Sequence, residues 1–294
     1  MSKEQKIAVI VLTLNEERNL PDCLASVQSL PCELYVIDSG STDRTISLAQ
    51  DAGASVFSHP FEDYARQRNW ALANIPSKCE WVLNLDADER LTPELAEEIR
   101  ETLASAPADI DGYVLRRRTV FMGRWIRHGG HYPNHQLRLF RRSRGVCEQR
   151  RYDQHFVTTG KIAFLKNDYV DIVASDLVTW SGRHVKWASA EADELMWGEN
   201  SADASAPRVR ADVMSGPIGR RRWLREKFYG RAPLFSRALG YWIYRYFIRF
   251  GFLDGKEGLV FHFLQGFWFR FLIDAITWDR RSDQRVSSPV QVDL

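Results

Sequence analysis

Short apolar runs alternate with helical segments from residue 6 to about residue 105, and this alternation constrains the fold more than any other feature. The apolar runs are IAVIVLT, ELYVID, ASVFS and WVLNLD, and the segments that separate and follow them have helical periodicity. Strands that alternate with helices form βαβ units, which build a parallel sheet with right-handed crossovers. In the last of these helices, Thr92 is placed to cap the N-terminus and Pro93 to occupy the first helical position. An α/β fold is therefore predicted.

The pattern changes after Pro107. The segments GYVLRRRTVFMG, HQLRLFRR and KIAFL resemble longer strands, which predicts antiparallel or mixed additions to the sheet. Residues 176 to 215 form a helical pattern that runs into a polar, Ala- and Ser-rich connection. We therefore expect one domain over residues 1–215, with halves 1–105 and 106–215, and a separate region over residues 216–294.

Charge and cysteine content exclude several classes of protein. The 294 residues carry a net charge of only +2, so no general positive field favours nucleic acid, and none is expected as a partner. The four cysteines are scattered without a C-x-x-C pair, which argues against a zinc knuckle or a disulfide framework and fits a reducing cytosol. The first apolar run lacks an A-x-A cleavage site and leads directly into Asn15 and Glu16, so a buried strand is preferred to a signal peptide.

Polar motifs follow successive strands of the predicted sheet. They are TLNEE at residues 13–17, DSGSTD at 38–43, RQRN at 66–69 and DAD at 86–88. Carboxylates where a strand ends suit Mg²⁺ or Mn²⁺, and open α/β sheets bind ligands at that edge. The alternative for any single motif is an ordinary turn or helix cap, where Asp is common. Because the four motifs line up at successive strand ends, we interpret them as one ligand site.

The expected ligand is a nucleotide held without a glycine-rich cradle. The chain has neither G-x-G-x-x-G after the first strand nor G-x-x-x-x-G-K-[ST], so a dinucleotide site and a P-loop are not expected. Asp38 would instead contact a base or ribose, Arg68 a base or phosphate, and a metal at Asp88 the diphosphate oxygens. The predicted binding residues are Thr13, Asn15, Glu16, Asp38, Arg68 and Asp86.

The chain resembles the nucleotide-sugar half of family 2 glycosyltransferases with the GT-A fold in four ordered motifs, VIVLTLNEERNL, VIDSGSTDRT, ARQRNWAL and WVLNLDADE. Its later segments GRWIRHGGHYPNHQLRLFRR and IRFGFLDGKEGL are similar to bacterial lipopolysaccharide-core and exopolysaccharide members of that family. The resemblance implies a Rossmann-like mixed sheet flanked by helices, with residues 1–105 as the nucleotide-sugar half and 106–215 as the acceptor half. It also implies transfer of a hexose from a UDP-sugar to a lipid-linked saccharide, with Mg²⁺ or Mn²⁺ as cofactor.

Such a transfer needs a cation and a base. Asp88, helped by Asp86, would hold the metal that neutralises the leaving diphosphate, and His184 is a candidate further ligand because GT-A enzymes sometimes add a late histidine. A packed or acceptor-contacting role is the alternative for His184.

The base would take the proton of the acceptor hydroxyl, and direct in-line attack would invert the anomeric centre. In the family the base comes from the acceptor half, where CEQRRYDQHF offers Asp153, Glu148 and, as a weaker candidate, His155. The alternative for either acid is an ion pair with neighbouring arginines.

Four further side chains are candidates for substrate contacts in the acceptor half. Arg183 and Lys186 are candidates for phosphate binding, with a solvated helix face as the alternative. Trp125 and Tyr132 are candidates for stacking on sugar rings, with a place in the core as the alternative.

Basic and aromatic residues are concentrated in residues 216–250, which hold nine Arg or Lys and one acid. Arg237, Arg245 and Arg249 recur at helical spacing beside aromatic and aliphatic residues, which predicts a cationic stripe suited to an anionic membrane surface. The following run GLVFHFLQGFWFRFLIDAITW is nearly long enough to span a bilayer, but its charged residues make spanning costly. We expect amphipathic helices and a cytoplasmic protein that is peripheral on the inner face of a bacterial inner membrane. The alternative is that these helices pack on the catalytic core.

Two rival functions are open to the sequence. A nucleotidyltransferase would share the sheet topology, but the glycine-rich loop expected after its first strand is absent. A membrane-surface protein that binds nucleotide sugars without turnover would have lost a metal acid, whereas Asp86 and Asp88 are both present. The sequence is also compatible with a homo-oligomer.

Overall fold

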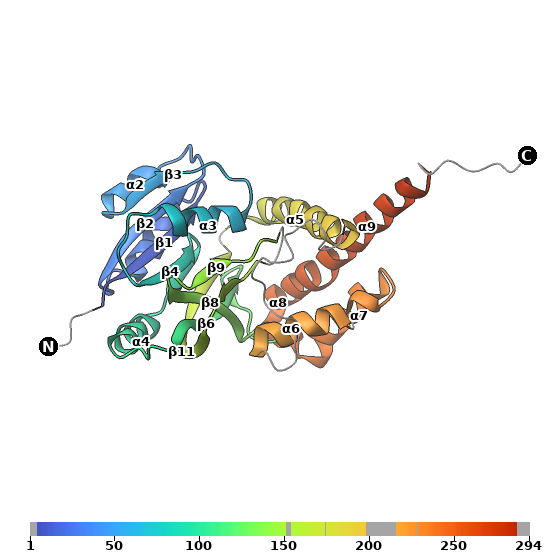
Figure 1. Ribbon diagram of the computed structural model, residues 1–294. Helices are drawn as coiled ribbons and strands as arrows, with labels where there is room; N and C mark the ends of the chain where they lie inside the picture. The colour runs from blue at the N-terminus through green and yellow to red at the C-terminus, as the bar shows by residue number, and fades with distance from the viewer. Residues whose placement is uncertain (1–4, 151–153, 174, 198–215, 228, 287–294) are drawn as a thin grey trace, which may run out of the picture.

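The computed structural model describes residues 5–150, 154–173, 175–197, 216–227 and 229–286. A mixed sheet with flanking helices forms one end of the molecule, and helices α5 to α9 form the other (Figure 1). The strands are β1 Ile7–Thr13, β2 Cys32–Asp38, β3 Ser55–Ser58, β4 Trp81–Asp86, β5 Glu89–Leu91, β6 Ile110–Phe121, β7 Arg124–Trp125, β8 Asn134–Arg141, β9 Gly145–Cys147, β10 Phe156–Thr158 and β11 Lys161–Val173. The helices are α1 Leu20–Ser26, α2 Thr45–Asp51, α3 Tyr64–Asn74, α4 Pro93–Ala104, α5 Leu177–Trp197, α6 Gly216–Lys227, α7 Ser236–Ile243, α8 Gly255–Phe261 and α9 Phe269–Val286.

The sheet has a parallel half and a mixed half. Its strands run in the order β3-β2-β1-β4-β8-β6-β11-β5, and β7 pairs with β6 beside this path. Strands β1 to β4 are parallel to one another, whereas β8 runs antiparallel to both β4 and β6, and β11 runs parallel to β6. The predicted parallel sheet with mixed additions is confirmed.

Both faces of β1 are buried, which explains why this strand is apolar at successive positions rather than alternately. Ile7, Val9 and Val11 belong to a buried cluster that includes residues of α1 and α4. Ala8 and Ile10 belong to a second cluster that includes residues of α3. Polar residues begin only where the strand ends. Side chains that could bind a ligand therefore lie in the loops at that edge of the sheet.

Side-chain caps determine where two of the flanking helices begin. The Thr92 hydroxyl accepts a hydrogen bond from the Leu95 amide at 3.2 Å and Pro93 begins α4, which confirms the predicted cap. Asp63 accepts from the Arg66 amide at 2.8 Å and begins α3. The start of α3 matters for the site because this helix carries Arg68.

The C-terminal helices pack against the rest of the chain. Helix α9 is joined to α5 by Arg270–Glu191 and Arg280–Asp193 ion pairs at 3.0 and 2.6 Å. The π-helical segment Tyr244–Ile248 continues α7, and a second π-helical segment, His262–Trp268, joins α8 to α9. Short 3-10 turns lie at Tyr229–Arg231 and Gly251–Asp254. Contacts also cross the predicted domain boundary, because Arg222 of α6 forms a buried ion pair with Glu148 at 2.7 Å. The domain division itself remains a prediction.

The predicted cationic stripe is wrong for two of its arginines. The guanidinium groups of Arg237 and Arg245 point inward, where Arg237 Nε donates to Asp274 at 2.8 Å and Arg245 Nε donates to the Gly129 carbonyl at 2.9 Å. Both side chains are buried, and only Arg249 of the three is exposed. Helical spacing shows that two faces differ, but it does not show which face packs on the protein.

Candidate active site

Three parallel strands bring the predicted motifs to one edge of the sheet. In the sheet register, Thr13 of β1 lies opposite Asp38 of β2, and Leu12 of β1 lies opposite Asp86 of β4. The Thr13 hydroxyl donates to the Asp38 carboxylate at 3.0 Å. Thr13, Asp38 and Asp86 therefore lie together, because the carboxyl ends of parallel strands share one edge.

The buried carboxylate of Asp38 organises the loop that follows β2. It accepts hydrogen bonds from the amides of Gly40 and Ser41 at 2.9 and 2.8 Å, and from the Ser41 hydroxyl at 2.5 Å. Gly40 has a φ of +98°, a left-handed conformation that glycine adopts without steric cost. The Asp38 side chain is thus used within its own loop, and its expected contact with a nucleoside remains a prediction.

The loop after β1 is hydrogen-bonded to the loop after β2. The Asn15 side-chain oxygen accepts from the Thr42 amide at 2.8 Å, and the Asn15 amide donates to the Ser41 hydroxyl at 2.8 Å. Asn15 itself has a φ of 56°. The Glu16 amide donates to the Thr45 hydroxyl at 2.8 Å. The predicted binding residues Asn15 and Glu16 therefore form one preorganised rim with the DSGSTD loop.

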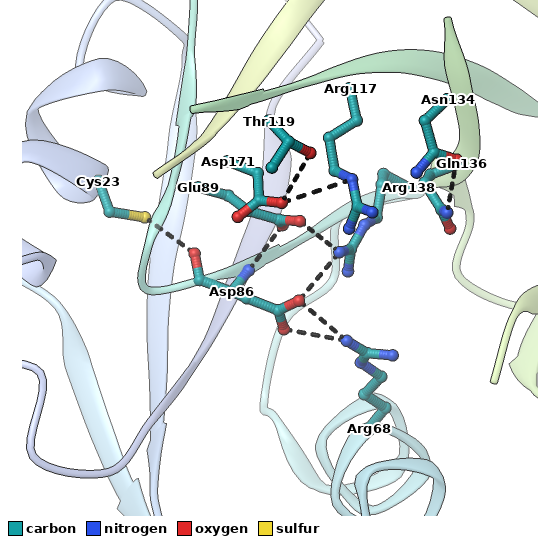
Figure 2. Close-up of polar contacts among 10 residues, drawn as sticks. All are labelled: Cys23, Arg68, Asp86, Glu89, Arg117, Thr119, Asn134, Gln136, Arg138 and Asp171. Carbon is teal, nitrogen blue, oxygen red and sulfur yellow. Dashed lines mark hydrogen bonds and ion pairs between the residues drawn. The ribbon is translucent and has the colours of Figure 1, made fainter. Parts of the chain in front are cut away.

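A buried network of arginines and carboxylates lies behind this rim (Figure 2). Arg68 donates to both Asp86 oxygens at 3.0 and 3.1 Å, and Arg138 donates to Asp86 at 2.9 Å and to Glu89 at 2.5 Å. Burial alone would raise the pKa of Asp86, but the two guanidinium groups hold it well below its usual value. Asp86 is therefore ionised, and each of its oxygens accepts a hydrogen bond from a guanidinium group.

Glu89 is the weaker acid of this network. Its carboxylate also accepts a hydrogen bond from the Asp86 amide at 2.9 Å. Burial raises the pKa of Glu89 to about 7, although Arg138 acts in the opposite direction. Removing one partner of a buried ion pair typically costs about 3 to 5 kcal/mol of unfolding free energy. The network therefore stabilises one conformation of the turn between β4 and β5.

Asp88 differs from Asp86 because no arginine or lysine of the described residues forms an ion pair with it. Within the described residues, no hydrogen bond or ion pair engages the half-buried Asp88 carboxylate. Burial raises the pKa of Asp88 well above its usual value, and the charges of Asp171, Asp86, Glu89 and Glu16 raise it further. The side chain thus lies in an excess of negative charge.

Asp171 of β11 is the neighbour that acts most strongly on Asp88. Strand β11 pairs with β5 so that Asp171 lies opposite Glu89, and the Ile172 amide donates to the Asp88 carbonyl at 3.0 Å. The Asp171 carboxylate is held by the Thr119 hydroxyl at 3.3 Å and by Arg117 at 3.6 Å (Figure 2). Strand pairing therefore places a second carboxylate beside Asp88.

The donor chemistry at Asp88 fits a hard divalent cation. Carboxylate oxygens are the ligands that Mg²⁺ prefers, and Mg²⁺ is commonly held by one or two carboxylates with water and substrate phosphates supplying the rest. In the part of the chain that the structure describes, no three His, Cys, Asp or Glu side chains are grouped to hold a metal ion by themselves. A cation held at Asp88 would therefore need further ligands from water or substrate.

Arg183 of α5 brings a cation near the rim at Glu16. Burial raises the pKa of Glu16, whereas Arg183 lowers it, so the guanidinium is within electrostatic reach of the rim. Arg183 also donates to the Ser175 hydroxyl at 2.6 Å. Arg183 is therefore better placed for a phosphate contact than Lys186, whose side chain is exposed on the same helix.

His184 lies in an aromatic pocket. Its ring stacks on Trp180 at a centroid distance of 3.5 Å and meets Phe269 edge to face at 5.3 Å, while Nδ1 donates to the Trp180 carbonyl at 2.9 Å. Burial lowers the pKa of His184 to about 4. These contacts support the packed role, and ligation of a metal by His184 remains a prediction.

Of the two acids proposed as the base, the structure describes only Glu148. The Glu148 carboxylate receives both Arg222 nitrogens at 2.8 and 2.7 Å and the His155 amide at 2.9 Å, and it is 1% exposed. Asp153 lies outside the described residues. Both oxygens of Glu148 are engaged by Arg222, so the contacts of Glu148 suit a structural role better than proton transfer.

The two aromatic candidates for sugar stacking contact each other. The rings of Trp125 and Tyr132 meet edge to face at 5.1 Å, and Arg118 lies over the Trp125 ring at 4.7 Å. The Tyr132 hydroxyl donates to Asp168 at 3.0 Å. Stacking of either ring on a sugar remains a prediction.

Sequence reasoning missed Arg138, Asp171 and Arg117. Arg138 lies between Leu137 and Leu139 in β8, and a polar residue flanked by buried apolar ones signals a polar partner in the interior. The partner itself depends on the pairing of β8 with β4 and on the position of β11, which join residues 52 to 82 positions apart. Long-range register of this kind is not visible in local patterns.

The mixed, helix-flanked sheet has the GT-A type of α/β fold, and comparison with known proteins agrees. The model of the family Glycosyl transferase family 2 matches residues 8–173, more than half of the chain. The chain therefore belongs to the family 2 glycosyltransferases.

Several curated proteins are similar to part of the chain. A lipopolysaccharide core biosynthesis glycosyltransferase, LpsC, of Rhizobium meliloti is 35% identical over 152 residues, which is 50% of this chain and 53% of that protein. A protein of Rickettsia bellii described as an uncharacterized glycosyltransferase is 37% identical over 105 residues, 36% of this chain and 35% of that protein. These matches span between about a third and about a half of the length of the relatives.

Solved structures give a partial likeness. Glucosyl-3-phosphoglycerate synthase from Mycobacterium tuberculosis, in a complex with Mn²⁺, UDP and glucosyl-3-phosphoglycerate, is 25% identical with a TM-score of 0.33. The match covers 39% of this chain and 44% of that chain.

Proposed function

We propose that this protein transfers a hexose from a UDP-sugar to a lipid-linked saccharide by a single displacement that inverts the anomeric centre. The observation that carries the proposal is the place of Asp88, an uncompensated carboxylate at the sheet edge where the loops after β1 and β2 also meet. An excess of negative charge around a carboxylate favours binding of a cation, and a diphosphate bound with its metal would supply one.

The residues that would hold Mg²⁺ or Mn²⁺ are Asp88 and, beside it, Asp171. When bound there, the metal would neutralise the charge that develops on the departing diphosphate. Asp86 serves this site by holding Arg68 and Arg138 against its two oxygens, which fixes the turn that carries Asp88. The earlier prediction that Asp86 itself binds metal would require it to exchange a guanidinium for the cation.

The remaining proton chemistry is proposed for the segment after β9. An acceptor hydroxyl becomes nucleophilic as a carboxylate takes its proton in the transition state. Since Glu148 is held by Arg222, we assign the base to Asp153 and a positioning role to Glu148. Arg183 would face the phosphates from α5, where electrostatic stabilisation of the transition state is worth most.

The resemblance to enzymes of bacterial surface polysaccharides supports the proposed acceptor and location. By its name, LpsC acts in lipopolysaccharide core biosynthesis, and such acceptors remain attached to a membrane. A cytoplasmic enzyme held at the inner membrane surface would share a surface with its acceptor, which raises their effective concentration.

The test is metal-dependent release of UDP from a panel of UDP-sugars in the presence of a lipid-linked acceptor. Asp88→Asn should abolish turnover, whereas Asp51→Asn, which alters an exposed acid at the end of α2, should not. Retained turnover in Asp88→Asn would contradict the site assignment. Binding of UDP-sugar without any turnover in the native protein would favour the rival of a binding protein.

A further inference from the structure

The C-terminal helices form a hairpin whose outer surface is apolar. One arm is α7 with its π-helical continuation to Ile248, and the other runs from Gly251 through α8 into α9. Six of its large apolar side chains are between 40% and 51% exposed, namely Leu239, Ile243, Phe247, Phe252, Leu259 and Phe263. We call these six residues the apolar face.

The hairpin directs its charges toward the protein. Arg237 pairs with Asp274, Arg245 donates to the Gly129 carbonyl at 2.9 Å, and Asp254 accepts from His128 at 2.7 Å. Asp254 and Asp274 are 2% and 0% exposed. A water-exposed amphipathic helix has the opposite arrangement, with charged residues outside and apolar residues inside. Charges that face the protein while apolar side chains face outward are typical of elements in contact with lipid.

Length and charge at the surface point to a bilayer rather than to another protein. The described stretch Gly251–Ser282 is helical and long enough to cross a membrane, with a mean hydropathy of 1.4 in its most apolar window, of which only 33% is buried. Between residues 239 and 271, the exposed charged side chains are Arg249 and Lys256, on either side of the turn that joins the two arms. Cations on flexible stems reach lipid phosphates while apolar neighbours enter the acyl layer.

We propose that the hairpin inserts the apolar face into the acyl layer of one leaflet without crossing it. Affinity then comes mainly from burial of apolar side chains, and two arginines of the predicted stripe, Arg237 and Arg245, contribute packing inside the protein instead of attraction to anionic lipid. Binding should therefore depend little on lipid charge, in contrast to adsorption through a basic helix.

The hairpin also holds a loop that leads to the candidate active site. The Gly129 amide donates to the Arg249 carbonyl at 2.9 Å, and His131 contacts the Thr119 hydroxyl at 2.9 Å. Thr119 in turn donates to Asp171, the carboxylate beside Asp88. If the proposed function is correct, insertion would place this loop at the level where a lipid-linked acceptor leaves the membrane.

The experiment is flotation of the full chain with vesicles of phosphatidylcholine alone and with added phosphatidylglycerol, without substrate. We expect binding to the two kinds of vesicle within about 3-fold, retained at about 1 M salt, where the Debye length is only about 3 Å. Binding to anionic vesicles alone, with loss at high salt, would overturn the proposal. Because no substrate is present, failure of glycosyl transfer would leave this result unaffected.

A matched pair of variants locates the contact. The triple variant Ile243→Asn, Phe247→Asn and Phe263→Asn should lower vesicle affinity at least tenfold. The control variant Phe61→Asn, Ile162→Asn and Phe164→Asn changes three side chains of similar exposure on the catalytic half and should bind as the native chain does. Equal binding of both variants would overturn the assignment. The proposal would also be overturned if the native chain did not bind vesicles and instead dimerised through the apolar face. Sedimentation of the native chain and of both variants would show this, once circular dichroism has shown that the variants are folded.

Discussion

Replacing His184 by glutamine should reduce the sensitivity of the fold to acid. Burial between Trp180 and Phe269 lowers the pKa of His184 from 6.5 to about 4. Between these values the unfolded chain binds a proton at this side chain and the folded protein does not, so stability is complete above about pH 6.5 and falls as the pH drops toward 4. A difference of about 2.5 pKa units corresponds to about 3 kcal/mol of unfolding free energy near pH 4.

The assay is urea unfolding of the native chain and of His184→Gln at about pH 7 and about pH 4. Glutamine can cost stability at both pH values, but it cannot titrate, so the loss between the two pH values should be smaller in the variant by about 2 to 3 kcal/mol. Mn²⁺ affinity, measured at neutral pH, should be unchanged. An equal pH dependence in both proteins would refute the buried neutral state. A tenfold loss of Mn²⁺ affinity would restore His184 as a metal ligand.

Three further predictions address the charge network and the base. Arg138→Met removes the guanidinium that pairs with the buried Glu89, whereas Asp86 keeps its contacts with Arg68, and should cost about 3 to 5 kcal/mol in urea unfolding; a loss below about 1 kcal/mol would show that the Arg138–Glu89 pair is not buried as described. Arg222→Met and Glu148→Gln should each be strongly destabilising, while the double variant should cost less than their sum; strict additivity would mean that the two side chains do not interact. Asp153→Asn should bind UDP normally and lose transfer, and an unchanged transfer rate would return the role of base to Glu148.

The parallel half of the fold could be predicted from the sequence because its information is local. The strands β1, β2 and β4 are each a short apolar run. Because the three strands are parallel, the motifs that follow them lie at the same edge of the sheet. Thr13, Asp38 and Asp86 therefore lie where their sequence positions place them. The cap at Thr92 was predictable for the same reason, since one side chain and the next turn decide it.

The rest of the site depends on long-range pairing and on which face of a helix packs inward. Asp171 reaches Asp88 only because β11 pairs with β5. Arg138 reaches Asp86 only because β8 pairs with β4 in one particular register. Arg237 and Arg245 share a face of α7 and its continuation, as expected. The same sequence pattern occurs in a helix that points its charges into water and in a helix that points them into the protein while its apolar face contacts lipid.

Binding of Mn²⁺ in the presence of UDP, followed by electron paramagnetic resonance, tests most directly whether Asp88 holds a cation against the phosphates of the donor. Native protein and Asp51→Asn should bind Mn²⁺ more tightly once UDP is present, and Asp88→Asn should lose most of that gain while remaining folded. Tight, UDP-dependent Mn²⁺ binding in Asp88→Asn would contradict the account.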